Sequence, residues 1–311
     1  AHGLSDFLSI AQAVAIGVRF QRVGIVLTYF SVVDVARETM NKHPWSLGGG
    51  GAADLKAALD GAATTTLGQL AESIGITCFT LEDDAFVSER AVFDRHAVET
   101  AYRRPLVEGD SIRDWTLFDG SEVVFPYDSD FNVLPEVAGL NAERWLWPFK
   151  ARLSNNKMFG GRTKIDDGLK WYEFGRLTTA KLKTPLTIAF SFVASHNHFV
   201  LDRGGKVFNR SAPVIKLPPG TSEDDHYALV GLLNSSVACF WMKQVFFPKG
   251  SATHDVSKDG LKPENNTYEF AATGMLKFPL PAGWRDARVI GHARVLEALG
   301  RERVALSPDF I

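Results

Sequence analysis

The chain has 311 residues, a formal net charge of -2 at pH 7 and a hydrophobic fraction of 45%, so we expect a folded, soluble protein with a sizeable core. Its two cysteines, Cys78 and Cys239, lack CxxC or Cys/His spacing, which argues against a disulfide framework and a thiolate zinc site and favours a cytoplasmic location. Arg19, Gln21 and Arg22 interrupt the apolar opening, so we expect neither a signal peptide nor a membrane span.

The first forty residues combine a helical pattern at Ser5 to Val18 with a β-branched, aromatic run at Val23 to Phe30. Residues 1–40 are therefore predicted to be a helix-strand remnant or linker of an upstream α/β domain. The glycine run Gly48 to Gly51 precedes a helix predicted over 52–59. Such a run can cradle phosphate, but no phosphate-loop or dinucleotide pattern follows, so we favour a turn that binds nothing.

The middle of the chain predicts short elements of both kinds. A helix is expected over 67–73 and a strand over 74–80, followed by an acidic turn at residues 82–84 that we interpret as solvated rather than metal-binding. Residues 122–155 are rich in aromatic side chains, which indicates core packing, with a helix expected over 142–153.

The second half predicts a sheet followed by helices. Strands are expected at 187–193, on both sides of the Gly204-Gly205 turn, and at 212–217. Thr221 or Ser222 is the expected cap of a helix that ends near Gln244, and a strand at 276–280 and a helix at 285–299 close the chain. The predicted fold class is α/β (mixed α+β), a target-recognition-type domain with a mixed sheet and flanking helices.

Positive charge is concentrated in one block. Between Lys150 and Lys216 there are thirteen Lys and Arg residues against four acids, a net charge of +9, so the rest of the chain carries -11. This asymmetry indicates either a surface for a polyanion or a solvated face that is paired with acidic neighbours.

The densest part of the block is HNHFVLDRGGKVFNR, from His196 to Arg210. The two histidines at i, i+2 would face the same way on a strand and could begin a metal site, but a third ligand is missing. No nucleophile motif marks a catalytic site. Arginine and lysine suit phosphates and guanine, and asparagine suits adenine, so the composition fits DNA better than chemistry.

Five segments in one order carry a family resemblance: HPWSLGGGGAADL (43–55), ESIGITCFTLEDDAFV (72–87), GDSIRDW (109–115), TPLTIAFSFVASHNHFVLDRGGKVFNRSAPVIKLP (184–218) and GLLNSSVACFWMKQVFFPKG (231–250). Over residues 41–281 the chain resembles the C-terminal target-recognition half of large bacterial adenine-specific DNA methyltransferases. The resemblance is to those of BREX phage-exclusion (phage-defence) systems, with fused type II restriction-methylation enzymes as more distant relatives.

The resemblance implies a DNA target-recognition domain over 41–281 and a C-terminal helical segment over 282–311. It also implies that a separate catalytic domain, in the same parent chain or in trans, binds S-adenosylmethionine and methylates a flipped adenine. The family's catalytic Asn-Pro-Pro-Tyr motif and methyl-donor glycine motif are absent here, so we expect no catalytic residue, no cofactor site, no metal site and no methyl transfer by this chain alone.

The sequence therefore predicts a sequence-specific, double-stranded DNA recognition module of a restriction-modification or phage-defence methyltransferase, without a membrane partner. The predicted DNA-binding residues are Lys157, Arg162, Lys164, Arg176, Lys181, Lys183, His196, Asn197, His198, Arg203, Lys206, Asn209, Arg210 and Lys249. His196, Asn197 and Asn209 are the expected base contacts, and the loop 249–266 is expected to order on the duplex. A free-standing DNA-processing enzyme such as a metal-dependent nuclease, or a truncated interaction subunit, remains the alternative.

Overall fold

The computed structural model describes residues 51–113, 115–118, 120–134, 139–183, 185–249 and 267–306. Four expectations lie outside these residues: the helix and strand of residues 1–40, the glycine run up to residue 50, the loop 250–266 and the last five residues.

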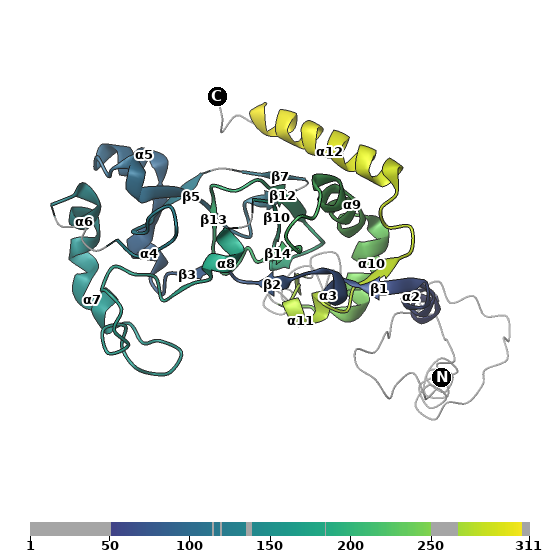
Figure 1. Ribbon diagram of the computed structural model, residues 1–311, viewed down its shortest axis with the longest axis horizontal. Coiled ribbons are helices and arrows are strands. Elements are labelled where there is room, and N and C mark those ends of the chain that lie inside the picture. The colour runs from purple at the N-terminus through teal and green to yellow at the C-terminus, as the bar shows by residue number, and fades with distance from the viewer. Residues whose placement is uncertain are drawn as a thin grey trace, which may run out of the picture.

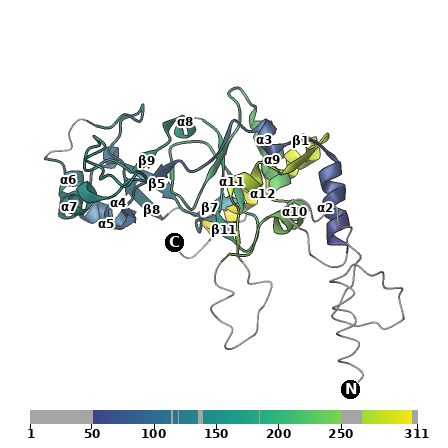
Figure 2. The same cartoon turned by 90° about the horizontal axis from the view of Figure 1, so that it is seen from below.

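The described chain is a mixed α/β structure with several small sheets and flanking helices, as predicted. Its helices are α2 (Ala52–Gly61), α3 (Leu67–Leu70), α4 (Asp83–Phe86), α5 (Arg90–Arg95), α6 (Asn141–Leu146), α7 (Lys150–Asn155), α8 (Thr179–Leu182), α9 (Glu223–Leu233), α10 (Ser236–Val245), α11 (Ala272–Met275) and α12 (Ala287–Ala305), with 3-10 turns at Thr100–Tyr102 and Trp147–Phe149. None of these helices is long and apolar enough to cross a membrane. The molecule is elongated, with α4 to α7 at one end and α2, α9 and α10 at the other (Figures 1 and 2).

A four-stranded antiparallel sheet forms the centre. Its order is β12 (Phe199–Asp202), β10 (Thr187–Phe190), β14 (Val214–Lys216) and β2 (Ser73–Gly75). Alternate side chains of these strands enter different cores: Ile188 and Phe190 join the larger cluster under the helices, whereas Ala189 belongs to a smaller cluster on the opposite face. Burial on both faces explains why the strand sequence is continuously apolar rather than alternating.

A second sheet lies beside the first and belongs to the other end of the molecule. Its order is β13 (Val207–Phe208), β5 (Arg103–Val107), β8 (Ser121–Val124) and β4 (Val87–Glu89), and β13 pairs with β5 in parallel. Gly204 and Gly205, both at positive φ, make the predicted turn between β12 and β13. The two strands do not pair with each other as a hairpin would, because the turn carries the chain from one sheet to the other.

Four strand pairs complete the described sheets: β1 (Ala63–Thr66) with β16 (Pro279–Pro281), β3 (Cys78–Phe79) with β9 (Arg176–Leu177), β6 (Ile112–Arg113) with β7 (Thr116–Leu117), and β11 (Val193–Ala194) with β15 (Tyr268–Glu269). The expected single strand over 74–80 is thus divided between β2 and β3, which join different partners.

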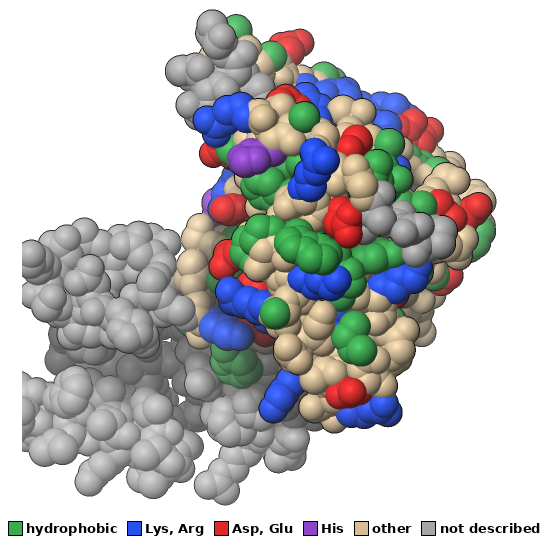
Figure 3. Space-filling view, turned by 90° about the vertical axis from the view of Figure 1, so that its left-hand side faces the viewer, with side chains coloured by type: hydrophobic (Ala, Val, Ile, Leu, Met, Phe, Trp, Pro, Cys, Tyr) green, Lys and Arg blue, Asp and Glu red, His purple; other side chains and the backbone are tan. Residues whose placement is uncertain are grey.

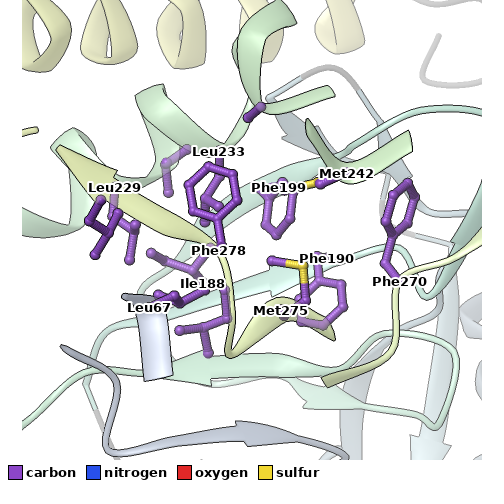
Figure 4. Close-up of a cluster of buried hydrophobic side chains, with 14 of the residues drawn as sticks. Leu67, Ile188, Phe190, Phe199, Leu229, Leu233, Met242, Phe270, Met275 and Phe278 are labelled. Atoms are coloured by element: carbon purple, nitrogen blue, oxygen red, sulfur yellow. The ribbon is translucent and has the colours of Figure 1, made fainter. Parts of the chain in front are cut away.

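The helix predicted to end near Gln244 is two helices. Ser222 caps α9 by accepting a hydrogen bond from the Asp225 N–H, as predicted, but Ser235 caps a new helix by accepting from the Ala238 N–H. The break lets α9 and α10 cover one face of the central sheet, where Leu229, Leu233 and Met242 point toward the strand side chains (Figure 4). The helix predicted over 142–153 is likewise interrupted, at the turn that contains Pro148.

Helix α12 packs along α9. A Cβ on Gly231 of α9 would lie 2.7 Å from the Val289 side chain and 3.3 Å from that of Ala293, so only glycine permits this approach. The C-terminal helical segment is therefore in close contact with the predicted recognition domain.

Candidate nucleic-acid interface

The stretch from His196 to Arg210 begins with side chains that support the fold. Asn197 and His198 are buried, and the Asn197 side-chain amide donates to the Leu233 carbonyl and, at 3.3 Å, to the Ser235 carbonyl. Asn197 therefore satisfies carbonyls at the break between α9 and α10, and a base edge cannot reach its amide without opening that contact.

The two histidines lie side by side, with ring centroids 4.1 Å apart. His196 is exposed and shares a hydrogen bond of 3.0 Å between its Nδ1 and the Ser195 hydroxyl, whereas His198 is buried. In the part of the chain that the structure describes, no group of three or more His, Cys, Asp or Glu side chains could hold a metal ion.

Arg203 is held by acidic side chains from distant elements. Its guanidinium donates to both Glu297 carboxylate oxygens, at 2.8 and 3.2 Å, and lies 3.0 Å from Glu223. It also donates to the Tyr227 hydroxyl at 2.6 Å, and that hydroxyl donates in turn to Glu297. Hydrogen bonding to Glu297 raises the pKa of Arg203 above its usual value. This arginine joins β12 to α9 and α12 and has little capacity left for phosphate.

The next polar residues of the stretch are also engaged. Lys206 donates to Asp202 at 2.8 Å, and Asp202 is buried. The Asn209 amide donates to Glu108 at 2.9 Å, while its oxygen accepts from the Ser211 N–H and hydroxyl at 2.8 and 2.6 Å. With every polar group of its amide engaged, Asn209 is poorly placed to read an adenine.

Three further predicted DNA contacts are neutralised or buried. Lys164 is fully buried and donates to the Glu173 carbonyl at 2.6 Å, while burial lowers its pKa to about 8 despite the opposing charges of Glu173 and Glu82. Arg162 lies 3.2 Å from Asp167 and donates to the Asp166 carbonyl. Lys249 pairs with Glu269. We therefore assign these cations to intramolecular support.

The remaining predicted cations converge on a different surface, around Phe79. Arg176 stands opposite Phe79 in the β3–β9 pair, and the Arg210 guanidinium lies 5.6 Å from the Phe79 ring centroid. The pKa of Lys181 is lowered by burial and further by the charge of Arg176. The Phe159 ring lies 5.8 Å from the Phe79 ring. We call Phe79, Phe159, Arg176, Lys181 and Arg210 the Phe79 patch.

The Phe79 patch is unlike the rest of the basic block because its arginines are exposed and lack acidic partners. Among the described residues, no carboxylate lies within ion-pair distance of Arg176, Lys181 or Arg210. Lys157 and Lys183 are also exposed, and they are close in sequence to Phe159 and Lys181 of the patch. Neither forms an ion pair within the described chain. The charge of Lys183 does help to lower the pKa of Asp128, although the two form no ion pair. Exposed cations without an ion pair, beside aromatic rings, suit a nucleic-acid backbone.

A second aromatic and cationic group lies at the end that holds α6 and α7. The Lys150 ammonium is 4.1 Å from the centroid of the half-exposed Trp147 ring and 5.4 Å from that of Trp171. Figure 3 shows that on this end Lys and Arg side chains lie on both sides of a band of exposed apolar side chains, with acidic side chains between them. This surface is mixed in charge, so it defines a polyanion site less clearly than the Phe79 patch does.

Sequence reasoning missed the aromatic members of the interface. Phe79 was assigned to a strand and Phe159 was not singled out, although its position just before Gly160-Gly161 places an apolar side chain in a turn. A large apolar residue in an otherwise polar, glycine-containing turn is the signal that could have found it.

Comparisons with known proteins agree with the motifs quoted from the sequence. No protein-family model matches the chain. The chain is 37% identical over 297 residues, 94% of its length, to the adenine-specific methyltransferase PglX of Streptomyces coelicolor, and it spans about a quarter (24%) of that relative. The predicted resemblance to adenine-specific methyltransferases is thereby confirmed.

Two solved structures are also similar. The type IIL restriction-modification enzyme MmeI in complex with DNA superposes with a TM-score of 0.49 at 12% identity, over 79% of this chain and 29% of the other. The type IIG restriction endonuclease BpuSI does so with a TM-score of 0.46 at 10% identity, over 79% and 28%.

Proposed function

We propose that this chain is the double-stranded DNA target-recognition region of an adenine-specific DNA methyltransferase. Residues 41–281 would form the recognition domain, and residues 282–311 would form a C-terminal helical segment that packs against it. The observation that carries the proposal is the Phe79 patch, in which Arg176 and Arg210 remain exposed without a carboxylate although the rest of the chain is acidic. The similarity to PglX supports the class of partner.

The electrostatics favour a polyanion over a small acidic ligand. The cations of the Phe79 patch come from three separate segments, β9, α8 and the chain after β13, so they face a surface rather than a closed pocket. Duplex DNA presents a regular row of phosphates to such a surface, and each neutralised phosphate releases condensed counterions. We therefore assign Arg176, Lys181 and Arg210 to phosphate contacts, with Lys157 and Lys183 as outer members.

Methyl transfer is proposed for a separate catalytic domain, in the same parent chain or in trans. S-adenosylmethionine would bind there, since the donor-binding and catalytic motifs of the family are absent from this sequence. In this arrangement the chain holds the duplex in register while the other domain acts on the adenine.

The test is binding of the purified chain to a duplex over a salt series, with and without S-adenosylmethionine. We expect log affinity to fall linearly with log salt, unchanged by the methyl donor. The double variant Arg176→Gln/Arg210→Gln should reduce the slope by about 2, because each lost phosphate contact removes about 0.9.

Arg95→Gln is the matched control, because it removes an exposed arginine at the end of α5, outside the Phe79 patch. It should leave the slope unchanged. Equal slopes for the double variant and the wild-type chain would refute the assignment of the patch. Absence of duplex binding at low salt would refute the module as an autonomous DNA reader and favour an interaction subunit that requires its catalytic partner.

A further inference from the structure

Phe159 occupies the tip of a short hairpin. The hairpin is closed by a bridge between Lys157 and Thr163 and by the Met158 N–H donating to the Arg162 carbonyl at 2.8 Å. The Gly161 N–H donates to the Met158 carbonyl at 2.8 Å, so Phe159 is the first central residue of a tight turn. Its side chain is 83% exposed, the largest exposed fraction among the large apolar residues described.

The residues that hold this hairpin in place are buried or paired. Lys164, whose ammonium is fixed on the Glu173 carbonyl, also donates its backbone N–H to the Asn156 carbonyl at 3.0 Å, so both ends of the hairpin are joined. The Arg162 guanidinium is held by Asp166 and Asp167 just beyond the turn. Two cations predicted to contact DNA are thus used to make the hairpin stiff, which limits the entropy that Phe159 would lose on binding.

The tip is open on the side that faces solvent. A Cβ placed on Gly160 or on Gly161 would meet no atom within 4 Å, so the wall of a groove can approach the turn without a clash. On the inner side the Phe159 ring is supported by Phe79, over which Arg210 lies. A supported, exposed ring beside cations that would hold phosphates is the arrangement of an apolar wedge.

We propose that Phe159 enters a base step of the bound duplex, partly unstacks it and bends the DNA toward the Phe79 patch. This inference rests on the proposed function and adds the mode of contact: the ligand is a duplex with a deformed step. An exposed phenylalanine alone would carry nothing, because single exposed apolar residues are common on protein surfaces. Here the ring packs against Phe79, which Arg176 and Arg210 flank without a carboxylate partner, and these cations favour DNA over a hydrophobic protein partner.

The test compares two duplexes of identical length, one fully paired and one with a central mismatch. Unstacking costs less at a mismatched step, so a protein that inserts a wedge prefers the mismatched duplex. We expect the wild-type chain to bind the mismatched duplex about tenfold more tightly. Phe159→Ala should bind both duplexes with affinities within about twofold of each other, and Phe159→Trp should retain the preference.

Phe247→Ala serves as the matched control, because it removes another exposed phenylalanine, on the segment after α10, and should leave the preference intact. The salt slope on the paired duplex should be unchanged in Phe159→Ala, since no phosphate contact is lost. Wild-type binding to both duplexes with equal affinity, or a preference that survives Phe159→Ala, would overturn the wedge and leave the recognition function standing. Failure of the wild-type chain to bind either duplex would overturn both.

Discussion

The stretch from His196 to Asn209 and the Phe79 patch, to which the adjoining Arg210 belongs, use their cations differently. Both are rich in cations, yet the stretch directs Arg203, Lys206 and Asn209 to Glu297, Asp202 and Glu108, whereas the patch leaves Arg176 exposed without a carboxylate. The acids that neutralise the stretch come mostly from outside the basic block. Local charge density therefore identifies a binding surface poorly unless the distant acidic partners are known.

The substitution that tests this contrast with the largest expected loss of stability is at Arg203. Replacing it with alanine leaves the buried Glu297 with only the Tyr227 hydroxyl and the more distant Arg301, at 3.6 Å, to offset its charge. We expect a loss of about 2–3 kcal/mol in the free energy of unfolding, below the usual range for buried pairs because Arg203 is 40% exposed. Urea-induced unfolding of the two proteins measures this loss of stability. Arg288→Ala, which breaks an exposed pair with Asp286, should cost far less stability, because water and salt screen an exposed pair. Equal losses for the two variants would show that the contacts of Arg203 with Glu297 do not stabilise the fold.

The Arg203 contact also predicts a pH dependence. Burial raises the pKa of Glu297, but hydrogen bonds from Arg203 and Tyr227 outweigh it, so the pKa lies below its usual value. A carboxyl with a lowered pKa contributes stability above its unfolded pKa and loses it as the pH falls through the folded value. The stability difference between wild type and Arg203→Ala should therefore shrink in acid. A difference that is constant with pH would contradict the charged contact.

The next effect is expected at Lys164, which buries its charge under the hairpin. Its folded pKa of about 8 lies below its value of 10.5 in the unfolded chain, so between these pH values the unfolded chain holds a proton that the folded chain has released. Stability should rise with pH in that window, by about 2–3 kcal/mol relative to Lys164→Met. If the free energies of unfolding of the two proteins change with pH in the same way from pH 7 to 10.5, the burial of a charged lysine is disproved.

A smaller loss of stability is expected at Asn197. Alanine there leaves the Leu233 carbonyl without its side-chain donor, while the Ser235 carbonyl keeps only the Cys239 N–H. Unfolding should become easier by about 1–2 kcal/mol, while duplex affinity of the folded protein stays unchanged. Asn155→Ala removes an exposed amide that donates to the Ala151 carbonyl and should cost about 0.5 kcal/mol or less. A loss of affinity without a loss of stability would restore Asn197 as a base contact.

The smallest effect is expected at His196, the exposed histidine of the stretch. We expect His196→Ala to change duplex affinity by less than about twofold, because its ring packs against the buried His198 and shares a hydrogen bond with the Ser195 hydroxyl. A tenfold loss in a titration at fixed salt would show that the stretch reaches DNA through this ring and would erase the contrast with the Phe79 patch.

The sequence predicted the fold better than it predicted the interface. Strand β10, the Gly204-Gly205 turn and the Ser222 cap follow from local rules of burial, backbone conformation and helix capping. The break at Ser235 was missed because the apolar spacing continues across it, and the cap is visible only as one serine among others. The separation of β12 and β13 into two sheets depends on partners far away in sequence, which no local pattern reveals.

The interface was only partly predictable for the same reason. Arg176 and Arg210 were included among the predicted contacts, but so were Lys164 and Asn197, whose burial depends on residues 9 and 36 positions away. A count of cations cannot distinguish an ammonium fixed on a carbonyl inside the protein from one that faces water. Exposure, which decides between them, is a property of the assembled fold.

The clamp at Arg203 also sets an order of events during synthesis. Glu297 lies 94 positions after Arg203, so the ribosome releases β12 and α9 well before the carboxylate that completes their contact. Until then Gly231 faces no helix, and Arg203 has Glu223 as its nearest acid among the described residues. Helix α12 thus closes this half of the molecule after β12 and α9 have been translated, which makes its docking a later folding step than theirs.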